Sequence, residues 1–465
     1  MKKISDIRKR FNQTKFPTMK TKRLIITLLI LSIYDFSVLA ADKIGKEKSD
    51  SIKTGWNFGA LPAISFDTDL GFQYGALVNF FNYGDGKRFP SYNHSLYFEV
   101  SHFTKGSGVY RFYYNSDQLI KNFDFFCDIT YLPDQANDFY GFNGFESVLN
   151  KSWEDQNSAS YKTRMFYKFQ QNLFRFKVDL MHKIGDSNFK WVAGFNMQNF
   201  SLSSVDLSKL NKGKSGADLL PNVPGLYEKY IAWGIISPGE ANGGFVPELK
   251  AGITYDTRDV KVNPMKGMWT EAVLTAVPEF LGAESGFTRF SLIHRQYFTL
   301  IKNDLSFAYR LGWQQTLSGH VPFYEQPQMI TTVMTGYATI GLGGSRYLRG
   351  ARRDRVIGDG VVYGNFEMRW KFARMNFIRQ KFYWGLNGFM DLGQVTKKIA
   401  LPTLSGMTEP LSDYFNPGAE QMHATYGAGL RLAMNQNFVI SLDYGMAMNK
   451  QDGDSGLYIG LNYLF

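Results

Sequence analysis

The sequence is poor in cysteine and in long apolar runs. Cys127 is the one cysteine in 465 residues, so no disulfide can form within the chain. It stands in an alternating apolar segment, where we interpret it as a small strand residue. The mean hydropathy of -0.25 excludes a helical membrane bundle, because each helical span needs a run of about 20 apolar residues.

Motifs for catalysis and metal binding are also missing. The six histidines are scattered, and none lies in a cluster at metal-ligand spacing. The sequence has no Gly-x-Ser-x-Gly element and no phosphate-binding loop. Asn93, His94 and Ser95 are adjacent, but neighbouring strand positions point to opposite faces and cannot form a triad. We therefore expect no enzyme, no cofactor and no metal.

The surplus of basic residues is concentrated at the start of the chain. Residues 1–40 carry nine Lys or Arg and two Asp, which leaves 43 basic and 39 acidic residues in the remainder. The formal charge of that remainder is about +4 rather than +11, so nucleic-acid binding loses its main support.

One long apolar run does occur, from Leu24 to Ile33, between a basic segment and several small residues. This pattern predicts a secretory signal in residues 1–40, cut after Ala40, with Met19 as an alternative start. A retained anchor helix is the competing interpretation, but the run is short and Asp35 follows it.

The rest of the chain divides into a short polar segment, 41–55, which we expect in the periplasm, and a strand-rich domain, 56–465. From Trp56 onward, short runs of Phe, Tyr, Val and Leu alternate with turn clusters, as in an all-β meander. Seventeen candidate strands can be marked: 58–65, 72–81, 94–103, 109–115, 123–131, 161–169, 174–184, 189–202, 248–257, 267–277, 287–300, 305–315, 361–372, 382–394, 426–434, 438–446 and 456–465.

The run from Val361 to Phe372 has two different faces. Val362, Met368 and Trp370 fall on one face together with Phe366 and Phe372, and the other face carries Asn365, Glu367, Arg369 and Lys371. In a soluble sandwich the apolar face would meet a core, and in an outer-membrane barrel it meets lipid while the charged face lines the lumen.

Barrel strands come in even numbers, so one of the 17 candidate strands is false, and we expect the error before Glu248. The predicted fold is an antiparallel transmembrane β-barrel of 16 strands, with long extracellular connections at 203–247, 316–360 and 395–423.

The stretch Gly341-Leu-Gly-Gly-Ser-Arg-Tyr-Leu-Arg349-Gly350 precedes this strand. At these residues the chain resembles the BamA/TamA superfamily of outer-membrane assembly barrels, the bacterial surface antigen family. The resemblance implies that the long loop folds into the lumen and that its tip, Arg349-Gly350, meets acidic residues on the next two strands, Glu367 and Asp391. The family usually carries an aromatic residue after the glycine, where this chain has Ala351. The resemblance also implies 16 strands. We expect this chain to be a barrel-only form of the family, without periplasmic repeat domains.

A second family pattern is a strand that ends in Asp256-Thr-Arg258-Asp259, followed by Pro264 and Gly267. We interpret it as a structural turn at the membrane boundary rather than as a binding site.

The chain ends in an alternating strand. Leu457, Ile459, Leu461, Tyr463 and Phe465 share one face in the pattern, and a terminal aromatic residue resembles the signal by which outer-membrane barrels are recognised for insertion. Such a strand is rare in soluble proteins, because an exposed apolar edge invites pairing.

Two main functions follow from these patterns, and an adhesin or surface-antigen role is a further alternative. The first is a bacterial outer-membrane barrel, monomeric in lipid, that helps to insert or translocate client outer-membrane or surface proteins delivered by a periplasmic partner. Strand pairing at a weak closure would then be the mechanism. The second is a pore or structural barrel without assembly activity, in which Arg349 only holds the loop.

Overall fold

The computed structural model describes residues 52–89, 91–261, 263–331, 341–377, 380–404, 407–434 and 438–465. The predicted signal in residues 1–40 and its alternative start at Met19 lie outside these residues, as does most of the predicted segment 41–55. Residues Thr54–Phe465 form one compact unit.

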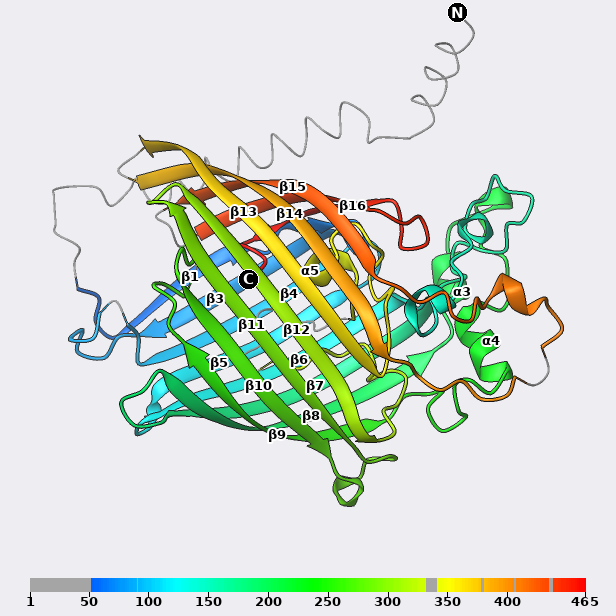
Figure 1. The fold of residues 1–465 in the computed structure, drawn as a ribbon, viewed down its shortest axis with the longest axis horizontal. Coiled ribbons are helices and arrows are strands. Elements are labelled where there is room, and N and C mark those ends of the chain that lie inside the picture. Colours follow the sequence, from blue (N-terminus) through cyan, green and yellow to red (C-terminus); the bar gives the residue numbers. More distant parts are fainter. Residues whose placement is uncertain are drawn as a thin grey trace, which may run out of the picture. The chain divides into compact units, whose positions relative to one another are not determined.

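Within the described residues, antiparallel strands pair in chain order and close into a barrel of 16 strands (Figure 1). Two short segments, β1 and β2, pair with β3 in one continuous register and together make the first strand of the wall. The segments are β1 (Trp56–Pro62), β2 (Ser65–Asp67), β3 (Gly71–Asn82), β4 (His94–Phe103), β5 (Gly108–Ile120), β6 (Phe123–Asp138), β7 (Lys168–Lys183), β8 (Phe189–Ser203), β9 (Phe245–Asp256), β10 (Gly267–Val277), β11 (Phe287–Ile301), β12 (Leu305–Gly319), β13 (Gly360–Phe377), β14 (Gln380–Lys397), β15 (His423–Met434), β16 (Phe438–Ala447) and β17 (Ser455–Leu461).

The predicted strand number is confirmed, and the false candidate is 161–169. β7 begins only at Lys168, and the residues before it belong to the connection that follows β6. Phe166 and Tyr167 imitate a strand in the sequence, but they are fully buried among connecting segments. Apolar residues in a packed loop and in a strand leave the same local pattern.

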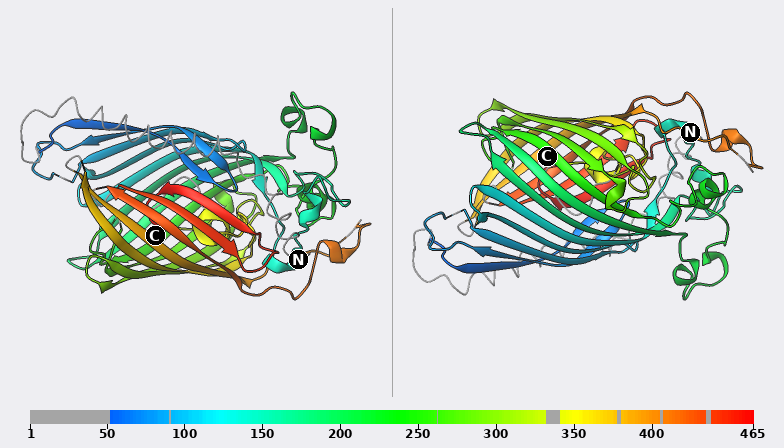
Figure 2. Two further views of the ribbon diagram at one scale, coloured as in Figure 1. Left: turned by 90° about the horizontal axis from the view of Figure 1, so that it is seen from above. Right: turned by 90° about the horizontal axis from the view of Figure 1, so that it is seen from below.

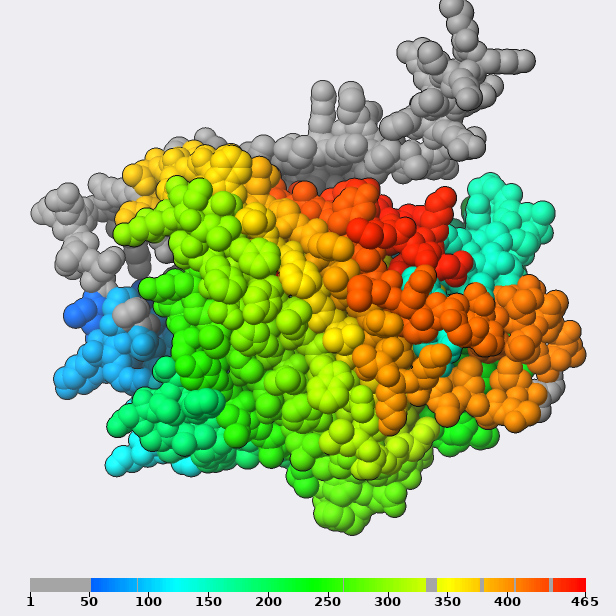
Figure 3. Space-filling view, in the orientation of Figure 1, coloured from blue at the N-terminus to red at the C-terminus, as the bar shows by residue number. Residues whose placement is uncertain are grey.

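The wall alternates as predicted. On β13, Asn365, Glu367 and Arg369 point inward and are almost completely buried, whereas Met368 and Trp370 are exposed on the outer surface. Figure 3 shows this outer surface as a continuous wall over β10–β14. An apolar exterior and a charged interior are the expected arrangement for a barrel in lipid.

The long connections leave the barrel at one end, and the short turns lie at the other (Figures 1 and 2). We name these the loop end and the turn end. The connections hold short helices: η1 (Gly144–Glu146), η2 (Lys151–Trp153), α3 (Leu207–Leu210), η3 (Gly216–Asp218), α4 (Leu226–Ala232), η4 (Glu279–Leu281), α5 (Gly344–Tyr347) and η5 (Leu411–Asp413). None of the helices in the described part of the chain is both long and apolar enough to cross a membrane.

Four connections pack together at the loop end, and we name their shared apolar cluster the loop cap. It joins 139–167, the α4 region, the β12–β13 connection and the residues after η5. Its aromatic members include Phe139, Phe142, Trp153, Phe166, Tyr230, Trp233, Phe323, Tyr414 and Phe415. These large buried side chains pack in one cluster with residues of the wall such as Phe169, Phe200 and Phe287, which joins the connections to the loop end of the barrel.

Candidate functional site

The described residues of the connection between β12 and β13, 320–331 and 341–359, enter the barrel, and we name them the inserted loop. Its helix α5 lies inside the wall in both orientations (Figures 1 and 2). The loop therefore places its predicted tip, Arg349-Gly350, in the lumen.

Arg349 contacts both predicted acidic partners. Its Nε and Nη2 atoms donate to the two carboxylate oxygens of Asp391, each at 2.9 Å, and its Nη1 donates to Glu367 at 2.7 Å. Asp443 on β16 lies 3.6 Å away, and the guanidinium stacks 3.5 Å above the ring of Phe389. Because the arginine is 1% exposed, it is held by charge pairing and stacking rather than by water.

Further arginines surround these acids. Arg369 donates from Nε to Glu367 at 2.8 Å, and Arg431 pairs with Asp443 at 2.8 Å. The local sequence indicated the inward face of Arg369 but gave no reason to connect Asp443 or Arg431 with the tip. Those residues reach the tip only because β16 lies next to β15 in the closed wall.

The backbone of the tip lies directly against β16. Gly350 has a φ of 107°, and a Cβ atom there would lie 2.6 Å from the carbonyl carbon of Gly445. A Cβ atom on Gly445 would lie 2.2 Å from the carbonyl oxygen of Arg349. Gly427, Gly445 and Gly456 are paired with one another on β15, β16 and β17. Because these three residues have no side chains, the backbone of the tip can approach the backbone of the wall.

Ala351 is buried where the family pattern has an aromatic residue. It packs in a small apolar cluster with Leu348 and Tyr347, and the ring of Tyr347 meets Tyr363 edge-on at 4.9 Å. Tyr347 thus supplies aromatic packing from a position before the tip.

The loop is also held beyond its tip by Arg352, Arg353 and Arg355. Arg353 donates to Asp134 at 2.8 Å and to Asp138 at 3.1 Å, at the end of β6. Arg355 donates to backbone carbonyls of the β6–β7 connection, and Arg352 pairs with Glu154 there. The inserted loop is therefore attached to the wall at its tip and to the loop cap at its exit.

The barrel closes through a very short contact, which we name the seam. The ladder between β17 and β2 has two pairs, Tyr458 with Asp67 and Ile459 with Phe66. Next to this ladder, the N–H of Thr68 donates to the carbonyl oxygen of Leu457 at 3.1 Å. The neighbouring pair β15–β16 forms a ladder over ten residues of each strand, 425–434 and 438–447.

Most of β1 has a partner on one side only among the described strands. The N–H of Ala63 donates to Gly75 of β3, and so the odd-numbered residues of this strand direct their backbone groups toward β3. The even-numbered residues Trp56, Phe58, Ala60 and Pro62 direct theirs toward the seam, where β17 does not reach them.

The inserted loop touches the seam. The backbone N–H of Gly350 donates to the hydroxyl of Tyr458 at 3.1 Å, and Tyr458 pairs with Asp67 across the closure. Neither the spacing nor the composition of the sequence indicated this link.

Tyr463 and Phe465 do not continue the outer face of the last strand, so that prediction is wrong. β17 ends at Leu461, and Asn462 has a φ of 68°, which turns the chain. Arg369 then draws the two aromatic rings inward: its guanidinium lies 4.5 Å from the Tyr463 ring and 4.8 Å from the Phe465 ring. Their predicted role as an insertion signal stays a prediction.

The residues of the predicted turn motif do form a turn between β9 and β10. Asp256 accepts hydrogen bonds from Nε and Nη2 of Arg258 at 2.9 and 2.7 Å, and Asp259 accepts from the backbone N–H of Met265 at 3.1 Å. Pro264 lies within this turn, and Gly267 begins β10 with a φ of 97°. These contacts are of the kind that stabilise a turn.

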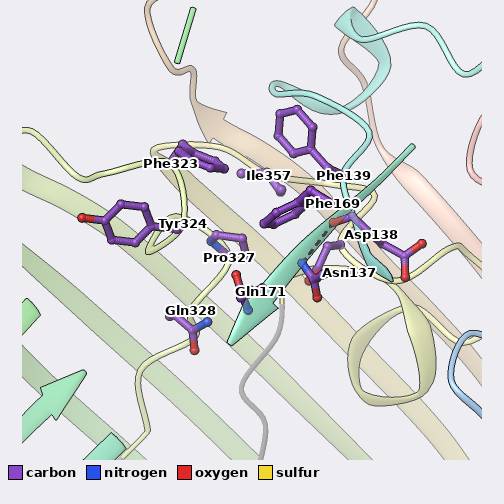
Figure 4. Close-up of a pocket in the computed structure, with 11 residues that line it drawn as sticks. Asn137, Asp138, Phe139, Phe169, Gln171, Phe323, Tyr324, Pro327, Gln328 and Ile357 are labelled. Atoms are coloured by element: carbon purple, nitrogen blue, oxygen red, sulfur yellow. Dashed lines mark hydrogen bonds between the residues drawn. The ribbon is translucent and has the colours of Figure 1, made fainter. Parts of the chain in front are cut away.

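A cavity of about 40 Å³ lies between the end of β6 and the inserted loop. Figure 4 shows Asn137, Phe169 and Phe323 on its wall, with Asp138 beside them. Since one water needs about 10–15 Å³ by this measure, the cavity holds only a few waters. In the part of the chain that the structure describes, no group of three or more His, Cys, Asp or Glu side chains is placed to hold a metal ion.

Comparisons with known proteins agree with this architecture. The Omp85 superfamily domain matches residues 138–465. The fold is similar to that of BamA from Haemophilus ducreyi lacking POTRA domains 1-3, with a TM-score of 0.51 and 14% identity over 88% of this chain and 70% of that chain. It is similar also to CdiB from Escherichia coli, with a TM-score of 0.52 and 10% identity over 88% of this chain and 63% of that one. A sequence comparison with curated proteins finds no match.

Proposed function

Because the chain belongs to the Omp85 superfamily and forms a β-barrel of the bacterial outer membrane, we propose that it assists the insertion of client outer-membrane or surface proteins. The observation that carries this proposal is the seam, where β1 has no strand partner on its seam side among the residues that the structure describes. Client strands would pair with β1 at this edge.

The edge has the chemistry of a strand acceptor. Trp56, Phe58 and Ala60 direct an N–H and a carbonyl toward the seam, and Pro62 directs a carbonyl alone. In lipid an unpaired backbone group costs several kcal/mol, because no water is present to bond it. A client strand that pairs here satisfies these groups by strand addition, and it also shields its own edge.

The interior favours lateral entry over passage along the barrel axis. The inserted loop places its buried tip in the lumen, and the loop cap packs large apolar side chains at the loop end. We place the loop end outside the cell and the turn end in the periplasm, where a partner protein delivers clients.

The test is depletion of the protein, followed by quantitative proteomics of the outer membrane. We expect a selective loss of one or a few surface proteins, which would be its clients. A barrel with a purely structural role, in which Arg349 only holds the loop, gives no change beyond its own loss.

A locked seam sharpens this test. In a Cys127→Ser background, Phe66→Cys with Ile459→Cys places a disulfide across an existing pair on the outer face. Under oxidising conditions this variant should fail to restore client levels in depleted cells, and a reductant should rescue it. Each single-cysteine variant is the control. Full restoration by the locked variant contradicts strand exchange at the seam.

A further inference from the structure

Four polar side chains lie together on the outer face of β10, β11 and β12, and we name them the outer polar cluster. Its members are Thr270 on β10, His294 and Gln296 on β11, and Tyr309 on β12. They alternate along the strands with buried, inward-pointing residues such as Arg295, so they point toward lipid. These strands lie on the near side of the barrel in Figure 1, and Figure 3 shows their outer face.

Hydrogen bonds join the members of the cluster. Oγ1 of Thr270 lies 2.8 Å from Nδ1 of His294, and Nε2 of His294 lies 3.3 Å from Oε1 of Gln296. The hydroxyl of Tyr309 donates to the same Oε1 at 3.2 Å. Both lone pairs of Oε1 are thus engaged, whereas the amide nitrogen of Gln296 has two N–H donors and no acceptor among the residues that the structure describes.

Two outward tryptophans mark the depth of the cluster in the membrane. Trp313 on β12 lies toward the loop end and Trp370 on β13 toward the turn end, and tryptophan is enriched at the two membrane–water interfaces. They belong to rows eight residues apart in the β12–β13 ladder. At a rise of about 3.3 Å per residue and a tilt of about 40°, these rows enclose about 20 Å of an apolar band that is about 25 Å tall. Tyr309 lies midway between the rows, so the cluster lies near the centre of the bilayer.

The other outward histidines on the described strands lie near strand ends. His94 begins β4, His102 is the last residue but one of that strand, and His182 is the last but one of β7. At these borders an imidazole can reach water or lipid headgroups. His294 lies in the middle of β11 instead. A polar side chain at that depth is costly in lipid, and this cost indicates a function for the cluster.

Lipid does not satisfy the free amide donors of Gln296. The headgroups and ester groups of a phospholipid lie at the interfaces, and its acyl chains carry no acceptor at the bilayer centre. An acceptor at this depth has to come from another protein that spans the membrane. Hydrogen bonds between polar side chains, glutamine among them, hold membrane-spanning segments together.

A second copy of this chain fits the site. All copies insert with the same orientation, so each presents its cluster at the same depth, and a twofold axis along the membrane normal brings two clusters face to face. The amide of Gln296 in one copy can then donate to the hydroxyl oxygen of Tyr309 or Thr270 in the other, since each oxygen retains a lone pair. Any other protein would match this depth only by chance.

We propose that two copies associate in the outer membrane through their outer polar clusters, as a parallel dimer with Gln296 at its centre. This inference goes beyond the proposed function and does not depend on it. Strands β13–β17 separate β12 from the seam, so the contact leaves the β1 edge of each copy open. The sequence led us to expect a monomer in lipid, and the dimer replaces that expectation.

The test measures association in lipid. In a Cys127→Ser background, Lys302→Cys in the exposed turn between β11 and β12 carries a donor or an acceptor dye. Energy transfer between copies is followed while the protein is diluted into vesicles of outer-membrane phospholipids. The parent should dimerise, and in Gln296→Leu the dissociation constant should rise about tenfold or more, because two symmetry-related hydrogen bonds are lost. Leucine suits a lipid-facing position, and the heat-dependent mobility of the barrel in detergent gels checks that the variant folds.

Two controls surround this measurement. Gln315→Leu makes the same change on the outer face of β12, beyond Trp313 and away from the bilayer centre, and should dimerise as the parent does. Single cysteines in the Cys127→Ser background give a second readout, which serves if the first variant does not insert. Leu311→Cys, opposite His294 in the β11–β12 ladder, should cross-link two copies on oxidation, whereas Val100→Cys, exposed to lipid on β4, should not.

A parent that stays monomeric at every dilution overturns the dimer, and so do equal dissociation constants for the parent and Gln296→Leu. Equal cross-linking through Leu311→Cys and Val100→Cys indicates random collision and overturns the assigned face. Neither readout involves a client, so the two proposals fail separately: unchanged client levels after depletion leave the dimer in place, and a monomeric barrel leaves client insertion in place.

Discussion

The hydroxyl of Tyr458 accepts a hydrogen bond from the backbone N–H of Gly350, so the tip of the inserted loop contacts the strand that closes the barrel. Asp443, on the adjacent strand β16, lies near Arg349. The charge network at the tip and the pairing at the seam thus share two neighbouring strands, and a change at one is expected to alter the other.

Tyr458→Phe should weaken the seam. It leaves the buried N–H of Gly350 without an acceptor, which costs about 1–2 kcal/mol. Amide exchange at Thr68, whose N–H donates to Leu457 across the seam, should become faster. Tyr444→Phe on the outer face of β16 is the matched control and should leave exchange unchanged. Equal rates of amide exchange at Thr68 in the parent and in Tyr458→Phe would show that the tip does not stabilise the seam.

Arg349→Ala should destabilise the barrel by about 3–5 kcal/mol, because Asp391 stays buried without its arginine and Glu367 keeps only Arg369. Arg349→Lys keeps the charge but cannot bond both oxygens of Asp391, so an intermediate loss is expected. The measurement is the unfolding midpoint of the purified barrel in detergent.

The control for this series is Arg374→Ala, which removes a half-exposed ion pair with Asp304 and should cost no more than about 1 kcal/mol. If Arg349→Ala unfolds like this control, the network at the tip does not stabilise the barrel.

Gly445→Ala should displace the loop tip without changing any charge. The added methyl group would meet the Arg349 carbonyl at 2.2 Å, and backbone must move to admit it, at about 1–3 kcal/mol. We expect faster cleavage of the inserted loop by added protease. Gly388→Ala on β14 adds the same methyl group where no atom lies within 4 Å, so its cleavage rate should equal that of the parent. Equal rates for both variants would show that the tip tolerates the methyl group.

The contact between His320 and Glu240 should make the loop end sensitive to pH. Nε2 of His320 lies 2.6 Å from Oε1 of Glu240, and this hydrogen bond raises the pKa of the imidazole above its usual 6.5. Burial acts to raise the pKa of Glu240, but the bond from His320 lowers it below 4.5. Protonated His320 contributes its full stabilisation of the folded loop end below pH 6.5, and this stabilisation is lost as pH rises through its raised pKa. Ionised Glu240 contributes its full stabilisation above pH 4.5, and this stabilisation is lost as pH falls through its lowered pKa.

The contact is therefore strongest between about pH 4.5 and 6.5, and the connection from 204 to 244 should resist protease better at pH 5.5 than at pH 8. Since the His320 side chain is 66% exposed, the effect should be small. His320→Gln should remove the pH difference, whereas His182→Gln at the turn end should retain it. A difference that persists in His320→Gln would assign it to another group.

The sequence by itself determined those features of this barrel that depend on neighbouring residues. The period of two along 361–372 identified the lipid and lumen faces, because successive side chains of a strand must alternate. The same parity placed Glu367 in the lumen. The family resemblance added Arg349 and Asp391, and the structure places Arg349 within hydrogen-bonding distance of both acids.

Only the tertiary structure decided where the chain departs from that period. Phe166 and Tyr167 pack in the loop cap rather than in a strand, because connections distant in sequence supply their neighbours. Thr68 meets Leu457 across 389 positions, and β17 ends at Leu461, where Asn462 has a positive φ and Tyr463 lies against Arg369. Local alternation cannot reveal a contact whose partner is distant in sequence and is brought close only when the sheet closes, and the seam and the contacts of Arg369 with Tyr463 and Phe465 are of this kind.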